Sequence, residues 1–311
     1  MSLSHATQYA SAKSSWASPF EYQEQHAGKK VRTDLTLALA ALYRVAPSTA
    51  QVLCHVVEKF NTASLVHDDI VDQDLMRRGA PSVWVKYGVG TALISGMYGY
   101  IHGLQKLGGL HNIDLMDAGL KSLEALHVGQ YLDTQVSDGT VLPTLEEYRF
   151  IAQTNTGCFF LFILESLQRL HALDKCIYSE LKAMMIELAV YYRYVNDYCD
   201  INHIPHFQKK GFAPDLEGGP KSFLMILANT ALPKQKRTDQ QKRQIILEFG
   251  RAGVFSAAIA VMEGSFKQMQ RSLEAIRNLS PDQNFAPLEV FLQNVHFQQN
   301  PADNFYENLN T

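Results

Sequence analysis

The sequence predicts an all-α fold, a helical bundle in a single domain, and three observations support this. Successive segments place apolar residues at helical spacing, and no stretch shows the apolar–polar alternation or the Asn-Gly turns typical of β-hairpins. The 311 residues are 46% hydrophobic and 19% charged, which suits a folded chain with a sizeable core. Nothing in the sequence marks a domain boundary or a repeat.

The predicted elements follow in order. An amphipathic pattern predicts a helix over 29–46, and Pro47-Ser48-Thr49 then restarts the chain into a helix over 48–68. After a break at 79–82, the small apolar residues of 89–108 predict a helix that is buried on most faces. Thr144 and Glu147 form a capping-box pattern at the start of a later helix. The remaining helices are expected at 114–133, 144–171 with a break near Gly157, 176–203, 221–230, 236–250, 252–279 and 284–297.

The two ends of the chain are expected to differ from this core. Residues 1–18 are rich in Ser and Ala but lack the basic start and continuous apolar stretch of a secretory signal, so we expect a loosely ordered arm and a cytoplasmic protein. The core domain is expected over 19–297, with a polar loop at 205–221. A polar tail is expected over 298–311.

Composition argues against several classes of function. The net charge of -3 offers no whole-protein field that would favour nucleic acid or an anionic membrane. The four cysteines are widely spaced without a CxxC pair, which favours free thiols in a reducing compartment. No apolar run approaches the length of a membrane span.

The first candidate site is an acidic stretch at the end of the 48–68 helix. Its charged residues are Asp68, Asp69, Asp72, Asp74, Arg77 and Arg78. Asp68 and Asp72 are four residues apart, so on a helix their carboxylates share one face and repel each other unless a cation lies between them. Mg2+ prefers oxygen ligands of this kind and usually shares them with substrate phosphates. A solvated, acidic helix end is the alternative interpretation of this stretch alone.

A second acidic cluster favours the interpretation as a site. Asn196, Asp197 and Asp200 again gather oxygen ligands on a predicted helix. Two such clusters that face each other across a bundle would hold Mg2+ ions and a diphosphate between them. Each nearby cation, taken alone, is more typical of a solvated surface charge. These cations are Lys29, Lys30, Arg32, Arg77, Arg78, Lys209, Lys210 and Lys221.

Taken in this order, these elements resemble the trans-isoprenyl diphosphate synthases, in particular the geranylgeranyl diphosphate synthases of eukaryotes. The resemblance covers roughly residues 26–230 and implies the isoprenoid synthase fold, with a central apolar cavity, and a homodimer. It rests on Gly28-Lys29-Lys30-Val31-Arg32, Ser64 through Gly79, Val128-Gly129-Gln130-Tyr131-Leu132-Asp133, Glu146-Glu147-Tyr148, Thr156-Gly157, Tyr191 through Asp200, and Asp215-Leu216 before Gly219.

The resemblance also implies roles for single residues. The first motif matches Asp68 and Asp72, with Asp69 beside them, and would hold an allylic diphosphate through Mg2+ ions. The second motif matches Asn196, Asp197 and Asp200 and would bind the remaining metal, giving three Mg2+ ions with the diphosphate. The implied substrate-binding positions are Lys29, Arg32, Asn61 and Arg78 for isopentenyl diphosphate, Gln130 and Thr156 in the cavity, and Arg77, Arg193, Lys210 and Lys221 around the allylic diphosphate.

Several of these positions depart from the family pattern. Asn155 stands in place of a lysine, which removes a positive charge beside the leaving group, and Arg193 restores that charge if its side chain turns inward. Loss of such a charge-assisted contact would cost about 1.5–3 kcal/mol. The other departures are Asn61 for a histidine, Arg193 for a glutamine, Asn196 for an aspartate and Pro220 for a lysine, with Lys221 one step late.

The small residues Ala63 and Ser64, just before the first motif, favour a product of twenty carbons. A close helix crossing explains their size equally well.

Three functions remain open from the sequence. Chain elongation with isopentenyl diphosphate is favoured because Lys29, Arg32 and Arg78 are kept. A synthase-like terpene cyclase, ionising a prenyl diphosphate of fifteen or twenty carbons, would suit the altered groups around the leaving diphosphate and the many aromatic residues. A non-catalytic partner subunit of a prenyl synthase would suit the lost ligands, but the intact first motif argues against it.

Overall fold

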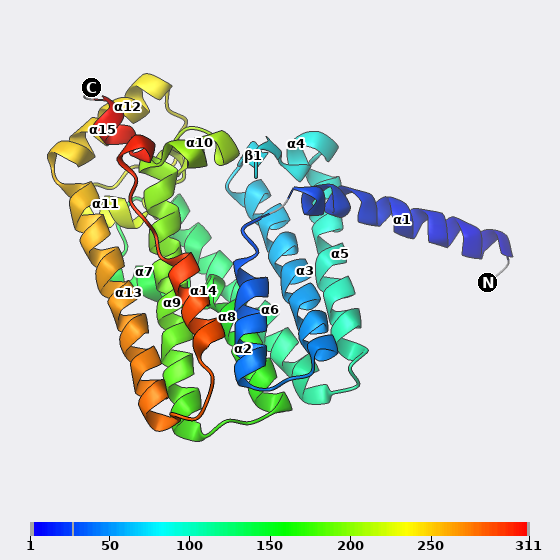
Figure 1. Cartoon of the computed structure of the whole chain (residues 1–311). Helices are drawn as coiled ribbons and strands as arrows, with labels where there is room; N and C mark the ends of the chain where they lie inside the picture. The colour runs from blue at the N-terminus through cyan, green and yellow to red at the C-terminus, as the bar shows by residue number, and fades with distance from the viewer. Residues whose placement is uncertain (1–2, 27, 310–311) are drawn as a thin grey trace.

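The computed structural model describes residues 3–26 and 28–309, and it confirms the all-α prediction (Figure 1). In chain order its elements are α1 (Leu3–Gln25), α2 (Val31–Leu42), α3 (Pro47–Val71), β1 (Met76–Arg77), β2 (Ala80–Pro81), α4 (Val83–Tyr87), α5 (Val89–Gly108), α6 (Ile113–Asp138), α7 (Leu145–Asn155), α8 (Gly157–Leu170), α9 (Lys175–Asn202), α10 (Ile204–Lys210), η1 (Pro214–Glu217), α11 (Phe223–Leu227), α12 (Asp239–Arg251), α13 (Val254–Leu279), α14 (Ala286–Val295), η2 (Pro301–Asp303) and α15 (Phe305–Leu309).

The long helices run side by side and bury one apolar cluster between them (Figure 1). Helix α3 packs against α5, α9 packs against α13, and α6 packs against α7 and α8. Burial of each large side chain, such as Phe162 or Leu188, contributes about 1.5–3 kcal/mol. This packing brings the C-terminal ends of α3 and α9, which carry the two acidic clusters, to the same end of the bundle (Figure 1).

Local sequence signals, such as capping residues and glycines, predicted most of the helix boundaries. The predicted capping box is confirmed, because the Glu147 amide donates to Thr144 Oγ1 at 3.1 Å and the Glu147 carboxylate accepts from the Thr144 amide at 2.7 Å. The predicted break near Gly157 falls at Thr156, between α7 and α8.

Helix α5 differs from the prediction that it is buried on most faces. Its glycines lie against α3 and α1: a Cβ on Gly99 would lie 2.9 Å from the Ala63 Cβ and closer still to the Phe20 ring. Its opposite side exposes large apolar residues, among them Ile94 and Met97. The small residues therefore serve a close crossing on one side only. Ala63 lies at this crossing, which explains its size without reference to a substrate.

The chain ends are more ordered than predicted. The expected arm over 1–18 is helical from Leu3 onwards, although residues 4–15 are exposed and project from the bundle (Figure 1). The expected tail contains η2 and α15 within residues 298–309. The Phe305 ring lies 5.2 Å from that of Phe207 and 5.0 Å from that of Phe212, so apolar contact holds this segment on the bundle. Residues 1–2 and 310–311 lie outside the described part.

The expected polar loop over 205–221 also contains regular structure. Helix α10 and the short η1 lie within it, and the amide of Gly79 donates to the Lys209 carbonyl at 3.0 Å. This hydrogen bond holds the 205–221 segment against the turn between β1 and β2.

One helical stretch, Leu145–Leu170, is long and apolar enough to cross a membrane by length and composition. A second would join α12 and α13, which are bent by 68°. The first stretch is 67% buried inside the bundle, as expected for the core of this fold, so it is weak evidence for a span.

The capping box at α7 provides a test of the fold. We expect Thr144→Ala to lower the free energy of unfolding by about 1 kcal/mol, because the Glu147 amide loses its acceptor. Thr154→Ala in the same helix is the matched control and should change stability by less than about 0.5 kcal/mol. Urea unfolding followed by circular dichroism measures both, and equal midpoints for the two variants would contradict the assignment.

Candidate active site

A two-strand hairpin positions the two arginines of the first motif. Met76 pairs with Pro81 and Arg77 with Ala80, and the turn between them has positive φ at Arg78 (55°) and at Gly79 (82°). Tight hairpin turns require this conformation, which glycine adopts most readily. The hairpin sends the two arginines to different partners: Arg77 to the carboxylates at the end of α3, and Arg78 to the carbonyl of His26 at 3.0 Å.

The first acidic cluster is held together by Arg77. Its guanidinium donates to Asp69 at 2.6 Å, to Asp74 at 3.1 Å and to Asp68 at 3.4 Å. Gln130 on α6 donates to the other oxygen of Asp68 at 3.1 Å. Burial, followed by repulsion from Asp72, raises the pKa of Asp68 to about 6. Burial raises the pKa of Asp69 to about 7 although Arg77 opposes it. Burial and the nearby Asp72 thus make the charged form of Asp68 costly unless a further cation is present.

In the second acidic cluster the two aspartates already have hydrogen-bond and ion-pair partners within the protein. Asp197 accepts from the Tyr148 hydroxyl and the Phe223 amide, both at 2.9 Å, and from Arg193 at 3.2 Å. Asp200 pairs with Lys210 at 2.8 Å. Both aspartates are buried, whereas Asn196 is half-buried.

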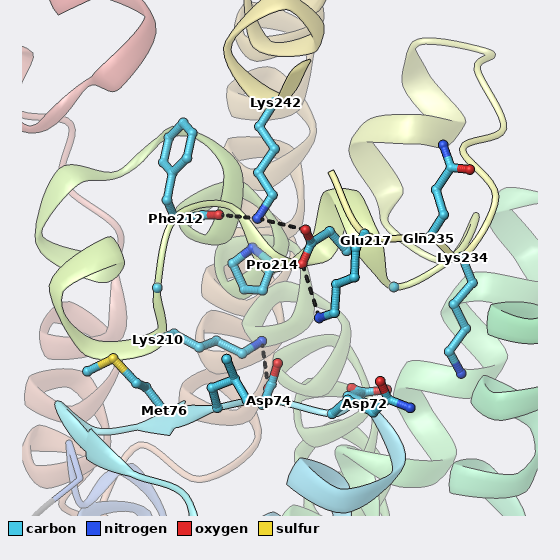
Figure 2. Close-up of a pocket in the computed structure, with 15 residues that line it drawn as sticks. Asp72, Asp74, Met76, Lys210, Phe212, Pro214, Glu217, Lys234, Gln235 and Lys242 are labelled. Carbon is cyan, nitrogen blue, oxygen red and sulfur yellow. Dashed lines mark hydrogen bonds and ion pairs between the residues drawn. The ribbon is translucent and has the colours of Figure 1, made fainter. Parts of the chain in front are cut away.

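One cation, Lys210, connects these clusters directly. Lys210 reaches Asp74 at 3.6 Å as well as Asp200, so one ammonium joins the end of α3 to α9. Figure 2 shows Lys210 and Asp74 at the edge of a pocket of about 470 Å³, which Asp72 also lines. Lys242, farther up the pocket wall, is bonded to the Phe212 carbonyl and to Glu217. The pocket is therefore a polar mouth that opens beside both clusters.

Asp133 on α6 is the centre of a buried ion chain. Its two oxygens accept from Lys221 at 3.1 Å and from Arg193 at 2.9 Å. Lys221 also donates to Asp72 at 2.7 Å, and Arg193 to Asp197, so the chain runs from α3 through α6 to α9. Burial alone would raise the pKa of Asp133, but Lys221 and Arg193 outweigh it and lower the pKa to about 2.

A second cationic site lies around the start of α2. The Arg32 guanidinium lies over the rings of Phe159 and Phe160 at 5.3 and 5.6 Å. Burial, then the charge of Arg77 and to a smaller degree that of Arg32, lowers the pKa of Arg78. Within residues 3–26 and 28–309, neither arginine forms a salt bridge. Lys29 is exposed nearby, at the entry to α2.

Aromatic rings form part of the core on the N-terminal side of the first cluster. Phe60, Tyr100 and Phe162 are buried between α3, α5 and α8, and the Phe60 ring centroid lies 6.3 Å from that of Tyr100 and 5.8 Å from that of Phe162. The Tyr100 ring lies 5.6 Å from His67, which directly precedes Asp68. Aromatic side chains therefore pack together between these helices.

Comparison with known proteins agrees with this architecture. The polyprenyl synthetase family model matches residues 13–252. The chain belongs to this family.

Curated relatives carry names from two kinds of enzyme. A geranylgeranyl pyrophosphate synthase 1 of Zymoseptoria tritici is 29% identical, with 83% of this chain and 80% of the relative covered. A geranylgeranyl pyrophosphate synthase of Neocamarosporium betae is 32% identical, with 67% and 60% covered. An ophiobolin F synthase of Aspergillus clavatus is 23% identical, with 88% of this chain but 41% of the relative covered.

Solved structures support the fold. A polyprenyl synthase from Caulobacter crescentus, complexed with calcium and isoprenyl diphosphate, aligns with a TM-score of 0.77 at 17% identity over 89% of this chain and 85% of that chain. A geranylgeranyl pyrophosphate synthase aligns with a TM-score of 0.70 at 20% identity over 88% and 91%.

Most of the predicted site residues of this polyprenyl synthetase meet at one end of the bundle. Asn61 and Thr156 do not join the ion chain: Asn61 is buried in α3, and the Thr156 hydroxyl donates to the Asn155 side chain at 3.1 Å. Asp133 ends the motif over residues 128–133 in the sequence, but the motif alone assigns it no role. Its signal was the spacing of three from Gln130, which places both on one face of α6.

The first acidic cluster fits a divalent ion better than the second. Asp68 and Asp72 keep partly exposed carboxylates, with side-chain exposures of 30% and 18%, and they are close enough for Asp72 to contribute, after burial, to the raised pKa of Asp68. Among the described residues no group of three acids or histidines forms a complete ligand set. Such a partial set is typical of Mg2+, which keeps waters and takes substrate phosphate oxygens as ligands. In the second cluster the carboxylates are buried and already paired.

The buried ion chain makes a direct prediction for stability. We expect Asp133→Asn to lower the free energy of unfolding by about 3–5 kcal/mol, because two buried cations, Lys221 and Arg193, lose their shared counter-ion. Asp138→Asn is the control in the same helix: its partner Lys234 is exposed, so the change should be below about 1 kcal/mol. Chemical denaturation measures both variants, and a small effect at Asp133 would contradict its central place.

Proposed function

We propose that this chain is a Mg2+-dependent prenyltransferase, similar to geranylgeranyl diphosphate synthases, that condenses isopentenyl diphosphate with an allylic diphosphate. The observation that carries the proposal is the presence of two separate cationic sites. One lies among the carboxylates of α3 and includes Arg77. The other lies around Arg32 and Arg78, neither of which forms a salt bridge within the described residues, so their guanidinium groups can take up an anion.

The carboxylate-rich site suits the allylic donor. When the carbon–oxygen bond of the allylic diphosphate breaks, negative charge develops on the departing diphosphate. Arg77 and Lys210 lie beside the polar mouth and can donate to its oxygens. Asp68 and Asp72 would hold Mg2+, which when bound supplies Lewis-acid stabilisation of the leaving group. The Tyr100 ring lies 5.6 Å from that of His67, which directly precedes Asp68, and it suits an allylic cation because the face of an aromatic ring attracts positive charge.

The second cationic site suits the acceptor. A diphosphate on Arg32 and Arg78 would leave its alkene free to approach the allylic cation. The alkene forms the new carbon–carbon bond, and loss of a proton from the neighbouring carbon restores a double bond. Arg32 is already packed against Phe159 and Phe160, so its guanidinium is oriented before an anion binds.

A terpene cyclase is the second candidate. It is supported by similarity to relatives named ophiobolin F synthase and preaspterpenacid I synthase, of which this chain spans 41% and 28%. The neutral Asn196 in the second cluster also favours it. A cyclase would ionise the same donor but would not use the Arg32 and Arg78 site.

An assay with defined substrates separates these functions. The purified chain is incubated with Mg2+ and geranyl, farnesyl or geranylgeranyl diphosphate, with and without isopentenyl diphosphate, and the products and released diphosphate are measured. A longer prenyl diphosphate that forms only with isopentenyl diphosphate supports the proposal. A hydrocarbon or alcohol formed without it would favour the cyclase, and no release of diphosphate from any donor would favour a non-catalytic subunit.

Arg78→Gln tests the acceptor site. Loss of one charge-assisted contact of about 1.5–3 kcal/mol should raise the KM for isopentenyl diphosphate about 10- to 100-fold. The KM for the allylic substrate should change little, because Arg78 faces His26 and not the carboxylates. Arg251→Gln on exposed α12 is the control. Equal effects on both KM values would contradict separate sites.

We also propose that the chain forms a homodimer, in the cytoplasm, through the exposed faces of α5 and α6. These helices pack against each other. Their exposed apolar residues are Val89, Leu93, Ile94, Met97 and Ile101 on α5, and Leu120, Val128 and Tyr131 on α6. Contiguous apolar surface of this kind is typical of an interface between proteins. The four cysteines are free, which agrees with a reducing compartment.

Charge placed on this face should separate the dimer. We expect wild type to have twice the 34.9 kDa mass of one chain, and the double variant Ile94→Lys/Met97→Lys to be monomeric. Val290→Lys, equally exposed on α14 far from α5 in Figure 1, should leave the dimer intact. Sedimentation velocity measures all three. A monomeric wild type, or a double variant that stays dimeric, would refute this interface.

A further inference from the structure

The carboxylates of the second acidic cluster are already neutralised by the protein. Asp197 accepts three hydrogen bonds, from Tyr148, from the Phe223 amide and from Arg193, and is 1% exposed. Asp200 is fully buried and lies 2.8 Å from Lys210 and 3.2 Å from the His206 ring. A divalent ion would have to displace these partners, which costs desolvation and broken hydrogen bonds.

The remaining member of this cluster adds no charge. Asn196 is half-buried and neutral, so it offers one amide oxygen where an acid would offer a negative charge. Hard cations bind carboxylates more strongly than amides because of that charge. The second cluster therefore offers a divalent ion one negative charge fewer than it would with an aspartate at position 196.

Arg193 supplies positive charge to Asp197, while Lys210 pairs with Asp200, and the position of Arg193 explains the missing lysine at Asn155. Gly129 on α6 touches Asn155 so closely that a Cβ there would lie 2.6 Å from the Asn155 amide nitrogen. Asp133 lies four residues farther along α6, about 6 Å along the helix axis. Arg193 reaches this same Asp133 from α9, at 2.9 Å. A positive charge beside Asp133 is thus provided from α9 instead of from the junction of α7 and α8.

We propose that Arg193 is the resident cation of the second acidic cluster, and that this cluster binds no divalent ion of its own. The inference rests on the proposed diphosphate site and alters one part of it: divalent ions are held at the first cluster, and a guanidinium takes the place of an ion at the second. Arg193 is a positioning residue, because it fixes Asp133 and Asp197 and thereby Lys221. The expected total of three Mg2+ ions would then fall by one.

Counting bound ions tests this without reference to turnover. The full chain, with saturating inorganic pyrophosphate, is titrated with Mn2+, and free Mn2+ is measured by electron paramagnetic resonance. The variant Asn155→Lys/Arg193→Gln/Asn196→Asp restores the family pattern of charge. We expect this variant to bind one more Mn2+ per chain than wild type. Arg193→Lys, which keeps the charge, should bind the same number as wild type.

Thermal unfolding provides the second measurement. Without metal, Arg193→Gln should melt below wild type, because Asp133 and Asp197 lose a buried partner, and Mn2+ with pyrophosphate should raise its Tm more than that of wild type. Arg149→Gln is the matched control: it removes a pair with Glu187 between α7 and α9, and should lower the Tm without changing the ion count.

The outcomes separate the two proposals. Equal ion counts for wild type and the triple variant would overturn the inference and leave the proposed function standing. If Arg193→Gln alone does not fold, the ion count of the triple variant still decides it, because Asn155→Lys there replaces the positive charge that Arg193→Gln removes. No Mn2+ bound to wild type with pyrophosphate would instead overturn the proposed function.

Discussion

Repulsion between buried carboxylates is the constraint on which the rest of this structure depends. The fold brings the ends of α3 and α9 together, so acidic side chains meet at one end of the bundle. The chain balances them with the series Asp72–Lys221–Asp133–Arg193–Asp197, in which acids and cations alternate. Buried pairs of this kind add little net stability, but they are costly to break. Their geometry therefore determines how α3, α6 and α9 fit together around the site.

The two acidic clusters differ in burial, and this difference bears on function. At the second cluster Asp197 and Asp200 are fully buried with protein partners, whereas Asp68 and Asp72 are partly exposed at the end of α3. Partly exposed carboxylates beside a pocket suit a divalent ion with a diphosphate. The hairpin turn at Arg78 and Gly79 separates this site from the cationic site at Arg32, so two anionic substrates can be held apart.

Three residues at which this chain departs from the family pattern are linked to one another. Asn155, Arg193 and Asn196 lie around Asp133 and Asp197, and a change at one alters the charge available to the others. The rings of Phe60 and Tyr100 also pack against each other on the N-terminal side of the first cluster. The structure thus supports the diphosphate end of the substrate more directly than the length of its chain.

The sequence by itself determined the helices, most of their ends and the identity of the acidic clusters, because helical periodicity, the Thr144 cap and the spacing of Asp68 and Asp72 are local properties. Only the tertiary structure decided what those acids contact. The role of Asp133, the inward turn of Arg193 and the exposed side of α5 depend on residues far away in the chain, and no local pattern encodes them. The order of the C-terminal segment has the same origin, since Phe305 finds its partners on α10 and at Phe212.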